Sequence, residues 1–95
     1  MKVQAEISLY PLGEREVLRS IEEFLEVVRE EGLDPRMGTM STTIVGESDV
    51  LFQAIARAFE RVAAHHRCVL IVKYSNACPP PTGAGEQEGD DSGKL

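Results

Sequence analysis

The chain has 95 residues, of which 42% are hydrophobic and 27% charged, and its formal net charge is −6 at pH 7. This length suits one domain with a modest core, and a small core favours oligomerisation. The acidic balance opposes a nucleic-acid partner, because binding to phosphates depends on Lys and Arg. An acidic protein attracts cations instead, including small organic ones.

The two cysteines, Cys68 and Cys78, are too few for a disulfide scaffold. The first ten residues alternate in polarity and include Glu6, so we expect no signal peptide. No apolar run approaches the roughly 20 residues that a membrane-spanning helix needs. We therefore expect a soluble cytoplasmic protein with no membrane partner.

The first predicted element is a strand at residues 3–10. Its side chains alternate between an apolar face and a polar face: Val3, Ala5, Ile7 and Leu9 on one, and Gln4, Glu6, Ser8 and Tyr10 on the other. A turn at residues 11–13 follows. The pattern predicts a strand with one face in the core.

A helix is predicted for residues 14–31. Its apolar positions recur every three or four residues, at Val17, Leu18, Ile21, Phe24, Leu25 and Val28. Gly32 is a suitable residue to end this helix, and Pro35 follows shortly after. Residues 36–47 then predict two short strands, at 36–40 and 41–46, in which Gly38 indicates a bulge or a close backbone approach.

The next helix is predicted to begin with Ser48 or Asp49 as its N-cap and to end near His65 and His66. Its predicted buried stripe consists of Leu51, Phe52, Ile55, Phe59, Val62 and Ala63. The last strand, residues 67–75, is apolar on both faces, so both faces need a cover.

The order β-α-β-β-α-β predicts an α+β ferredoxin-like fold, in which two helices cover one face of a four-stranded antiparallel sheet. We assign residues 1–79 to this domain and residues 80–95 to a disordered tail, because the tail lacks apolar anchors. The other sheet face starts out uncovered and must include either Val69 and Ile71 or Leu70 and Val72. Self-association through this face is the simplest way to cover it.

Catalytic and metal sites find little support in the sequence. His65, His66 and Cys68 have no second pair of ligands nearby, so we expect no metal site. Cys78 lacks an obvious base, although a thiol-dependent enzyme stays open as an alternative. The hydroxyls have no G-x-S-x-G context, and the Gly residues match no phosphate loop. A ligand-free scaffold or regulatory module is the third alternative.

Polar residues gather instead at the ends of the predicted strands. They are Ser8 and Tyr10, Thr39, Ser41 and Thr42 or Thr43, and Ser75 and Asn76, with Met37 or Met40 nearby. Because the first strand lies between the third and fourth in a ferredoxin-like sheet, we expect these groups to converge. Hydroxyls, an amide and a phenol suit a small, flat, polar heterocycle.

Three segments, ISLYPLG, GTMSTTIVGE and SNACP, together resemble the small thiamine-binding protein family over about residues 3–79. Met40-Ser41-Thr42 ahead of Gly46-Glu47 matches the family's M-[GS]-T segment ahead of a Gly-Glu pair. The helix end AAHHR departs from the family, in which a Gly before the last strand is more typical.

The resemblance implies a ferredoxin-like protein that forms dimers or tetramers through its sheets. It implies binding of thiamine or hydroxymethylpyrimidine without catalysis and without a cofactor. Hydroxyls and Asn76 would then match the amino group and ring nitrogens of the pyrimidine. Tyr10 would stack on the ring, and Glu6 or Glu47 would favour the positive thiazolium.

Overall fold

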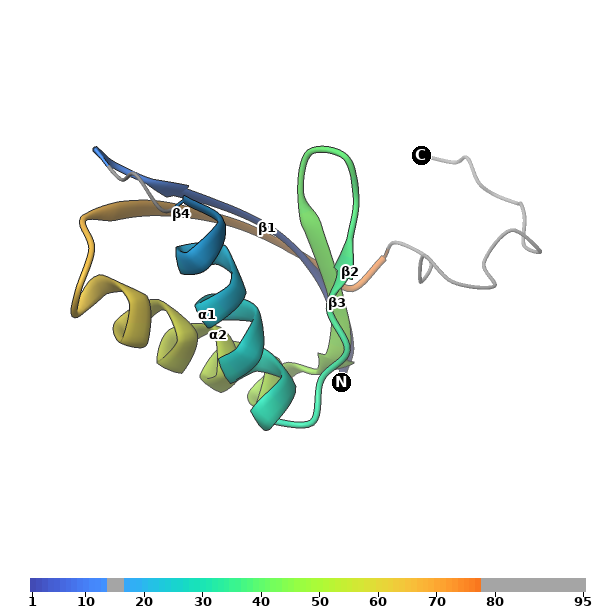
Figure 1. Cartoon of the computed structure of the whole chain (residues 1–95). Helices are drawn as coiled ribbons and strands as arrows, with labels where there is room; N and C mark the ends of the chain where they lie inside the picture. The colour runs from blue at the N-terminus through green and yellow to red at the C-terminus, as the bar shows by residue number, and fades with distance from the viewer. Residues whose placement is uncertain (14–16, 78–95) are drawn as a thin grey trace.

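The computed structural model describes residues 1–13 and 17–77 (Figure 1). Its elements are β1 (Lys2–Pro11), α1 (Val17–Glu30), β2 (Arg36–Met37), β3 (Thr42–Glu47), α2 (Ser48–Ala63) and β4 (Cys68–Ser75). This is the order that the sequence predicts. The predicted tail at residues 80–95 and Cys78 lie outside the described residues.

The four strands form one sheet in the order β2-β3-β1-β4, and every neighbouring pair is antiparallel. Both helices lie on the same face of this sheet (Figure 1). The ferredoxin-like α+β fold is therefore confirmed, as is the place of β1 between β3 and β4.

The alternation of β1 sets the core. Val3, Ala5 and Ile7 are buried under the helices, next to Ile44 of β3. A residue of β3 or β4 that lies directly opposite a β1 residue is on the same face of the sheet as that residue. β3 and β4 therefore also have one face toward the helices and one away from them. The face without helices, which we call the bare face, carries Gln4, Glu6, Ser8, Tyr10, Thr43, Val45, Val69, Ile71 and Lys73.

β4 is apolar on both sides, as predicted, and the structure decides which residues lie where. Leu70 and Val72 pack against the core. Val69 and Ile71 lie on the bare face, where they are 44% and 50% exposed. The bare face therefore carries apolar side chains that the fold itself leaves open to solvent.

Gly32 ends α1 as predicted. Its φ of 87° lies in the left-handed region that favours glycine. The Gly32 N–H donates to the Arg29 carbonyl at 2.9 Å, and the Leu33 N–H donates to the Val28 carbonyl at 3.3 Å. These two hydrogen bonds satisfy carbonyls at the helix end and form a Schellman motif.

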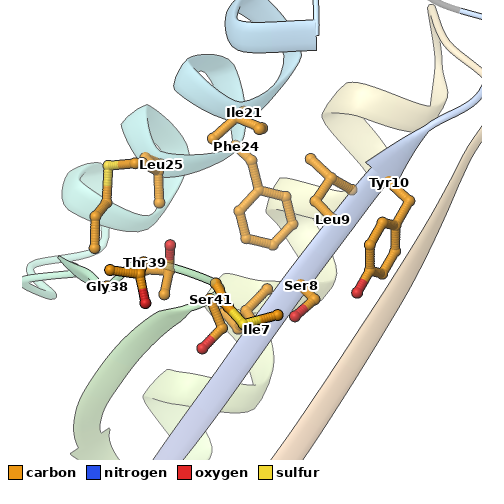
Figure 2. Close-up of a pocket in the computed structure, with 13 residues that line it drawn as sticks. Ile7, Ser8, Leu9, Tyr10, Ile21, Phe24, Leu25, Gly38, Thr39 and Ser41 are labelled. Carbon is orange, nitrogen blue, oxygen red and sulfur yellow. The ribbon is translucent and has the colours of Figure 1, made fainter.

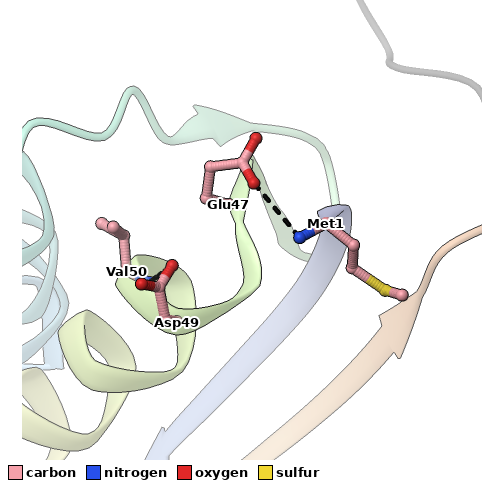
Figure 3. A network of polar contacts seen from close by, with 4 residues as sticks. All are labelled: Met1, Glu47, Asp49 and Val50. Atoms are coloured by element: carbon pink, nitrogen blue, oxygen red, sulfur yellow. Dashed lines mark hydrogen bonds and ion pairs between the residues drawn. The ribbon is translucent and has the colours of Figure 1, made fainter.

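The N-cap prediction for α2 was wrong. The N-cap is Glu47, whose side chain makes no capping hydrogen bond and lies 3.2 Å from the Met1 ammonium (Figure 3). Asp49, in the first turn, accepts a hydrogen bond from the Val50 N–H at 2.8 Å. Ser48 is already helical because β3 runs directly into α2, so the helix begins one residue earlier than the side chains suggested.

The buried stripe of α2 also differs from the prediction. Ala54 and Ala58 are buried, whereas Phe52 is exposed and packs edge-on against Tyr74 of β4, with ring centroids 4.5 Å apart. β4 is an edge strand, so no further element covers this pair within the described residues. Small alanines bring α2 close to the sheet, and the large Phe52 remains outside.

Candidate functional site

A cavity of about 210 Å³ lies between the second half of β1, α1 and the β2–β3 hairpin (Figure 2). Its wall contains residues from all three elements: Ile7, Ser8, Leu9 and Tyr10 from β1, Ile21, Phe24 and Leu25 from α1, and Met37, Gly38, Thr39, Met40, Ser41 and Thr42 from the hairpin. Segments that are distant in sequence thus build one site.

The cavity exists because β1 is longer than its pairing with β3. β1 pairs with β3 from Lys2 to Ile7, but it pairs with β4 as far as Pro11. The hairpin turns at residues 38–41, where the Gly38 N–H donates to the Ser41 carbonyl at 2.7 Å. The end of β1 therefore has an open edge facing the turn.

Gly38 permits this tight turn. A Cβ at position 38 would lie 3.2 Å from the Ser41 carbonyl oxygen, which is closer than most such contacts. The close backbone approach that the sequence indicated is therefore present, and it sets the shape of the hairpin loop beside the cavity.

The base of the cavity is apolar and its mouth is open. Ile7, Phe24 and Leu25 are buried, and Figure 2 shows Phe24 pointing from α1 toward β1. Met40 at the rim is 89% exposed, and Tyr10 is 50% exposed. A flat apolar surface at the base with adaptable side chains at the rim suits a ring-shaped ligand.

Several of the predicted hydroxyl residues line this cavity together. Thr39, Ser41 and Thr42 contribute to its wall. Ser8 also lines it, although the Ser8 side chain belongs to the bare face. The register settles the choice between Thr42 and Thr43: Thr42 lies opposite Ile7 on the helix side, whereas Thr43 lies opposite Glu6 on the bare face. Thr43 is not part of the cavity wall.

Glu6 has partners on the bare face. Its Oε2 accepts a hydrogen bond from the Ser41 Oγ at 2.8 Å, and its Oε1 lies 3.7 Å from the Lys73 Nζ. Part of its charge is therefore already balanced by Lys73. Glu6 does not line the cavity, but it contacts the lining residue Ser41. The Ser41 oxygen still has lone pairs that can accept a hydrogen bond from a ligand.

Three predicted site residues lie at the opposite end of the sheet. Ser75 is opposite Gln4, Asn76 follows it, and Glu47 is opposite Lys2. The predicted convergence is wrong for Ser75 and Asn76, because β4 runs antiparallel to β1 and so ends beside the start of β1. Glu47 instead contacts the N-terminal ammonium.

The apolar half of the cavity was missed by reasoning from the sequence. In the sequence, Ile21, Phe24 and Leu25 stand out only as apolar positions of the first predicted helix. Their spacing of three and four residues places them on one side of α1, and the ferredoxin-like order lays α1 over β1. These two observations together would have located α1 at the site.

Within residues 1–13 and 17–77, neither helix has the length and apolarity needed to cross a membrane. The same part of the chain holds no group of three or more His, Cys, Asp or Glu side chains placed to bind a metal ion. The expectations of no cofactor and no catalysis stay predictions.

Solved structures from several organisms share this fold. A hypothetical protein from Methanocaldococcus jannascii is 28% identical, with a TM-score of 0.72 and 79% of each chain covered. A domain of unknown function from Bacillus cereus is 26% identical, with a TM-score of 0.67, covering 78% of this chain and 74% of that one.

A Thermotoga maritima protein, provisionally named for thiamine biosynthesis or salvage, has a TM-score of 0.70 at 21% identity, covering 79% of this chain and 83% of that one. That level of identity shows the shared fold alone. No match to a curated protein sequence is found for this chain.

A family model described as thiamine-binding protein matches residues 5–76. The match runs from β1 through the end of β4 and contains every residue that lines the cavity. It also contains the ISLYPLG and GTMSTTIVGE segments that suggested the family from the sequence. The chain belongs to the thiamine-binding protein family.

Proposed function

We propose that the protein binds thiamine, or its hydroxymethylpyrimidine half, in the cavity between β1, α1 and the hairpin. We propose further that it does so without catalysing a reaction, as a cytoplasmic carrier or buffer. The observation that carries this proposal is the cavity itself: it joins an apolar base to the hydroxyls of Thr39, Ser41 and Thr42, within the span that the family model matches.

The apolar base of the cavity suits the flat face of a pyrimidine ring, and its hydroxyls suit the polar edge of the ring. Buried Phe24 and Leu25 offer apolar surface to the flat face of the ring. Ser and Thr hydroxyls both donate and accept, so they match an amino group as well as a ring nitrogen. A few placed polar groups in an apolar pocket fix the orientation of a ligand.

The size of the cavity supports binding of one ring rather than two. Its volume of about 210 Å³ is smaller than the about 300–1,000 Å³ typical of pockets for drug-sized ligands. In this proposal the pyrimidine enters the cavity and the thiazolium stays at the mouth. The aromatic face of Tyr10 and the net charge of −6 both favour a cation there.

We propose that the protein assembles as a homodimer or homotetramer through the bare face. Val69, Ile71 and Tyr10 expose apolar surface on this face. A second copy of the chain would cover these apolar groups.

The test is a calorimetric titration of the full chain with thiamine and, separately, with hydroxymethylpyrimidine. We expect saturable binding with one site per chain and recovery of the ligand unchanged. Absence of saturable heat with both ligands would remove the proposal. Turnover of thiamine that disappears in a Cys78→Ser variant would establish an enzyme in its place.

A further inference from the structure

We propose that the main chain of Leu9 recognises the ligand by its edge, so that the cavity selects flat heterocycles carrying a hydrogen-bond donor and an acceptor side by side. The inference rests on the proposed function, since it takes the same cavity as the site. It adds the atoms that orient the ring, which are backbone atoms rather than the hydroxyls that the sequence emphasised.

The pairing with β4 shows which way the Leu9 peptide groups point. In an antiparallel pair, opposite residues alternate between hydrogen-bonded and non-hydrogen-bonded positions. The Leu12 N–H donates to the Arg67 carbonyl at 2.8 Å, one position beyond the Pro11–Cys68 pair. Because every second residue of β1 is hydrogen-bonded to β4, the bond at Leu12 means that Tyr10 is also hydrogen-bonded to β4, whereas Leu9 is not. The Leu9 N–H and C=O therefore point away from β4.

The pairing with β3 gives the same answer from the other edge. The Ser48 N–H donates to the Met1 carbonyl at 2.8 Å, one position before the Lys2–Glu47 pair. The alternation then makes Ile7 and Thr42 a hydrogen-bonded pair, which is the last pair between β1 and β3. Two residues further along β1, Leu9 points to the same edge and has no opposite residue in β3.

The hairpin is too short to satisfy Leu9. Continuation of the register would bring Met40 opposite Leu9, but residues 38–41 form the turn that the Gly38–Ser41 hydrogen bond closes. No backbone hydrogen bond joins Leu9 to the hairpin among the described residues. Because Leu9 lines the cavity, its N–H and C=O form the one unpaired donor and acceptor that β1 presents there.

This edge suits a small ring better than another strand. Pro11, the next residue that points to this edge, has no N–H, so the donor at Leu9 has no successor within β1. A single N–H and C=O pair gives an added strand very few hydrogen bonds. The same pair matches a ring whose adjacent atoms donate and accept.

An aminopyrimidine has this arrangement on one edge. Its exocyclic amino group would donate to the Leu9 carbonyl, and the ring nitrogen beside it would accept from the Leu9 N–H. Phe24 and Leu25 at the base exclude water from the ring, which strengthens such bonds. Removal of the amino group would leave the carbonyl unpaired and should lower affinity about five- to a hundredfold.

Amide hydrogen exchange of the full chain, followed by NMR, tests the inference directly. In the free protein the Leu9 amide should exchange faster than those of Ile7 and Tyr10, which are bonded on opposite edges. With hydroxymethylpyrimidine at about ten times its Kd, the Leu9 exchange should slow by about tenfold, since only the unliganded fraction exchanges. Ile7 and Tyr10 serve as internal controls on the same strand.

Three probes separate this inference from the proposed function: thiamine, hydroxymethylpyrimidine and 2-aminopyridine, a minimal donor–acceptor ring. If calorimetry shows that hydroxymethylpyrimidine binds but the Leu9 exchange is unchanged, the inference is overturned and the proposed function stands. If only 2-aminopyridine binds and protects Leu9, the inference stands and the proposed function fails. Failure of all three probes to protect Leu9 overturns the inference.

Discussion

The Ser41 Oγ donates a 2.8 Å hydrogen bond to the Glu6 Oε2, and this contact ties the hairpin turn to the bare face of the sheet. Ser41 lines the cavity, whereas Glu6 belongs to the face that we propose for assembly. The two residues connect the proposed ligand site with the proposed interface.

We expect Glu6→Ala to lower the affinity for hydroxymethylpyrimidine about two- to tenfold, because the net value of one hydrogen bond is about 0.5–1.5 kcal/mol. The same change made in a Ser41→Ala background should have little further effect, since the bond is already absent. Calorimetric titration of the two single variants and the double variant measures this coupling.

Lys73→Ala is the matched control, because Lys73 also contacts Glu6 but does not line the cavity. The ligand affinity of Lys73→Ala should stay within about twofold of the original, because Lys73 does not line the cavity and the Ser41–Glu6 hydrogen bond remains. Fully additive effects of Glu6→Ala and Ser41→Ala would show that the contact does not position the hairpin for binding.

Ile71→Glu should dissociate the proposed oligomer. Ile71 lies opposite Ser8 on the bare face and is 50% exposed in the single chain. A charge buried there without a partner costs several kcal/mol, so the dissociation constant should rise about a hundredfold or more. Sedimentation velocity and light scattering at micromolar concentrations measure the change.

Leu18→Glu provides the comparison, because Leu18 is 72% exposed but lies on α1 rather than on the sheet. It should leave the assembly intact. A wild-type chain that is monomeric at these concentrations, or equal dissociation by both variants, would exclude the bare face as the interface.

The Phe52–Tyr74 contact predicts a dependence on alkaline pH. Burial raises the pKa of Tyr74 above its ordinary value of 10.0, because the phenolate loses hydration in the fold. The stability that depends on the neutral phenol is fully present below pH 10.0 and is lost as the pH rises through the higher folded pKa. Tyr74→Phe should remove this contribution to the pH dependence of unfolding.

Ultraviolet titration checks the direction of this shift. The chain has two tyrosines, so a Tyr10→Phe variant leaves only Tyr74 to titrate. Its phenolate should form at a higher pH in the folded chain than in the same chain unfolded by urea. Equal midpoints in the two states would contradict the argument from burial.

Much of the fold follows from local patterns. The alternation in β1 predicts which side chains of that strand are buried, and Gly32 marks the end of α1 because only its left-handed φ of 87° suits the turn there. The hairpin register does not follow in this way. It depends on a turn without an Asn-Gly or Asp-Gly signal, closed by the hydrogen bond between Gly38 and Ser41.

The site could be predicted only in part for a related reason. Ser8 and Ser41 mark the cavity because their hydroxyls lie close to predicted strand ends. Asn76 has the same kind of neighbours in sequence, yet it lies at the far end of the sheet because β4 is antiparallel to β1. No side chain in the sequence marks the Leu9 main chain as part of the site. Its N–H and C=O are left unpaired because β1 pairs with β3 only as far as Ile7, although it pairs with β4 as far as Pro11.

The most direct test compares the hydroxymethylpyrimidine affinity of Thr42→Val, Thr43→Val and Asn76→Ala by calorimetric titration. Thr42 lines the cavity, whereas Thr43 and Asn76 do not. Removing a hydroxyl that pairs with the ligand costs about 1–3 kcal/mol, so Thr42→Val should lower the affinity about five- to a hundredfold. Its fold should persist because Val suits a strand. The other two variants should stay within about twofold of the original affinity. An unchanged affinity in Thr42→Val, or a loss only in Asn76→Ala, would contradict the proposal that the ligand binds between β1, α1 and the hairpin.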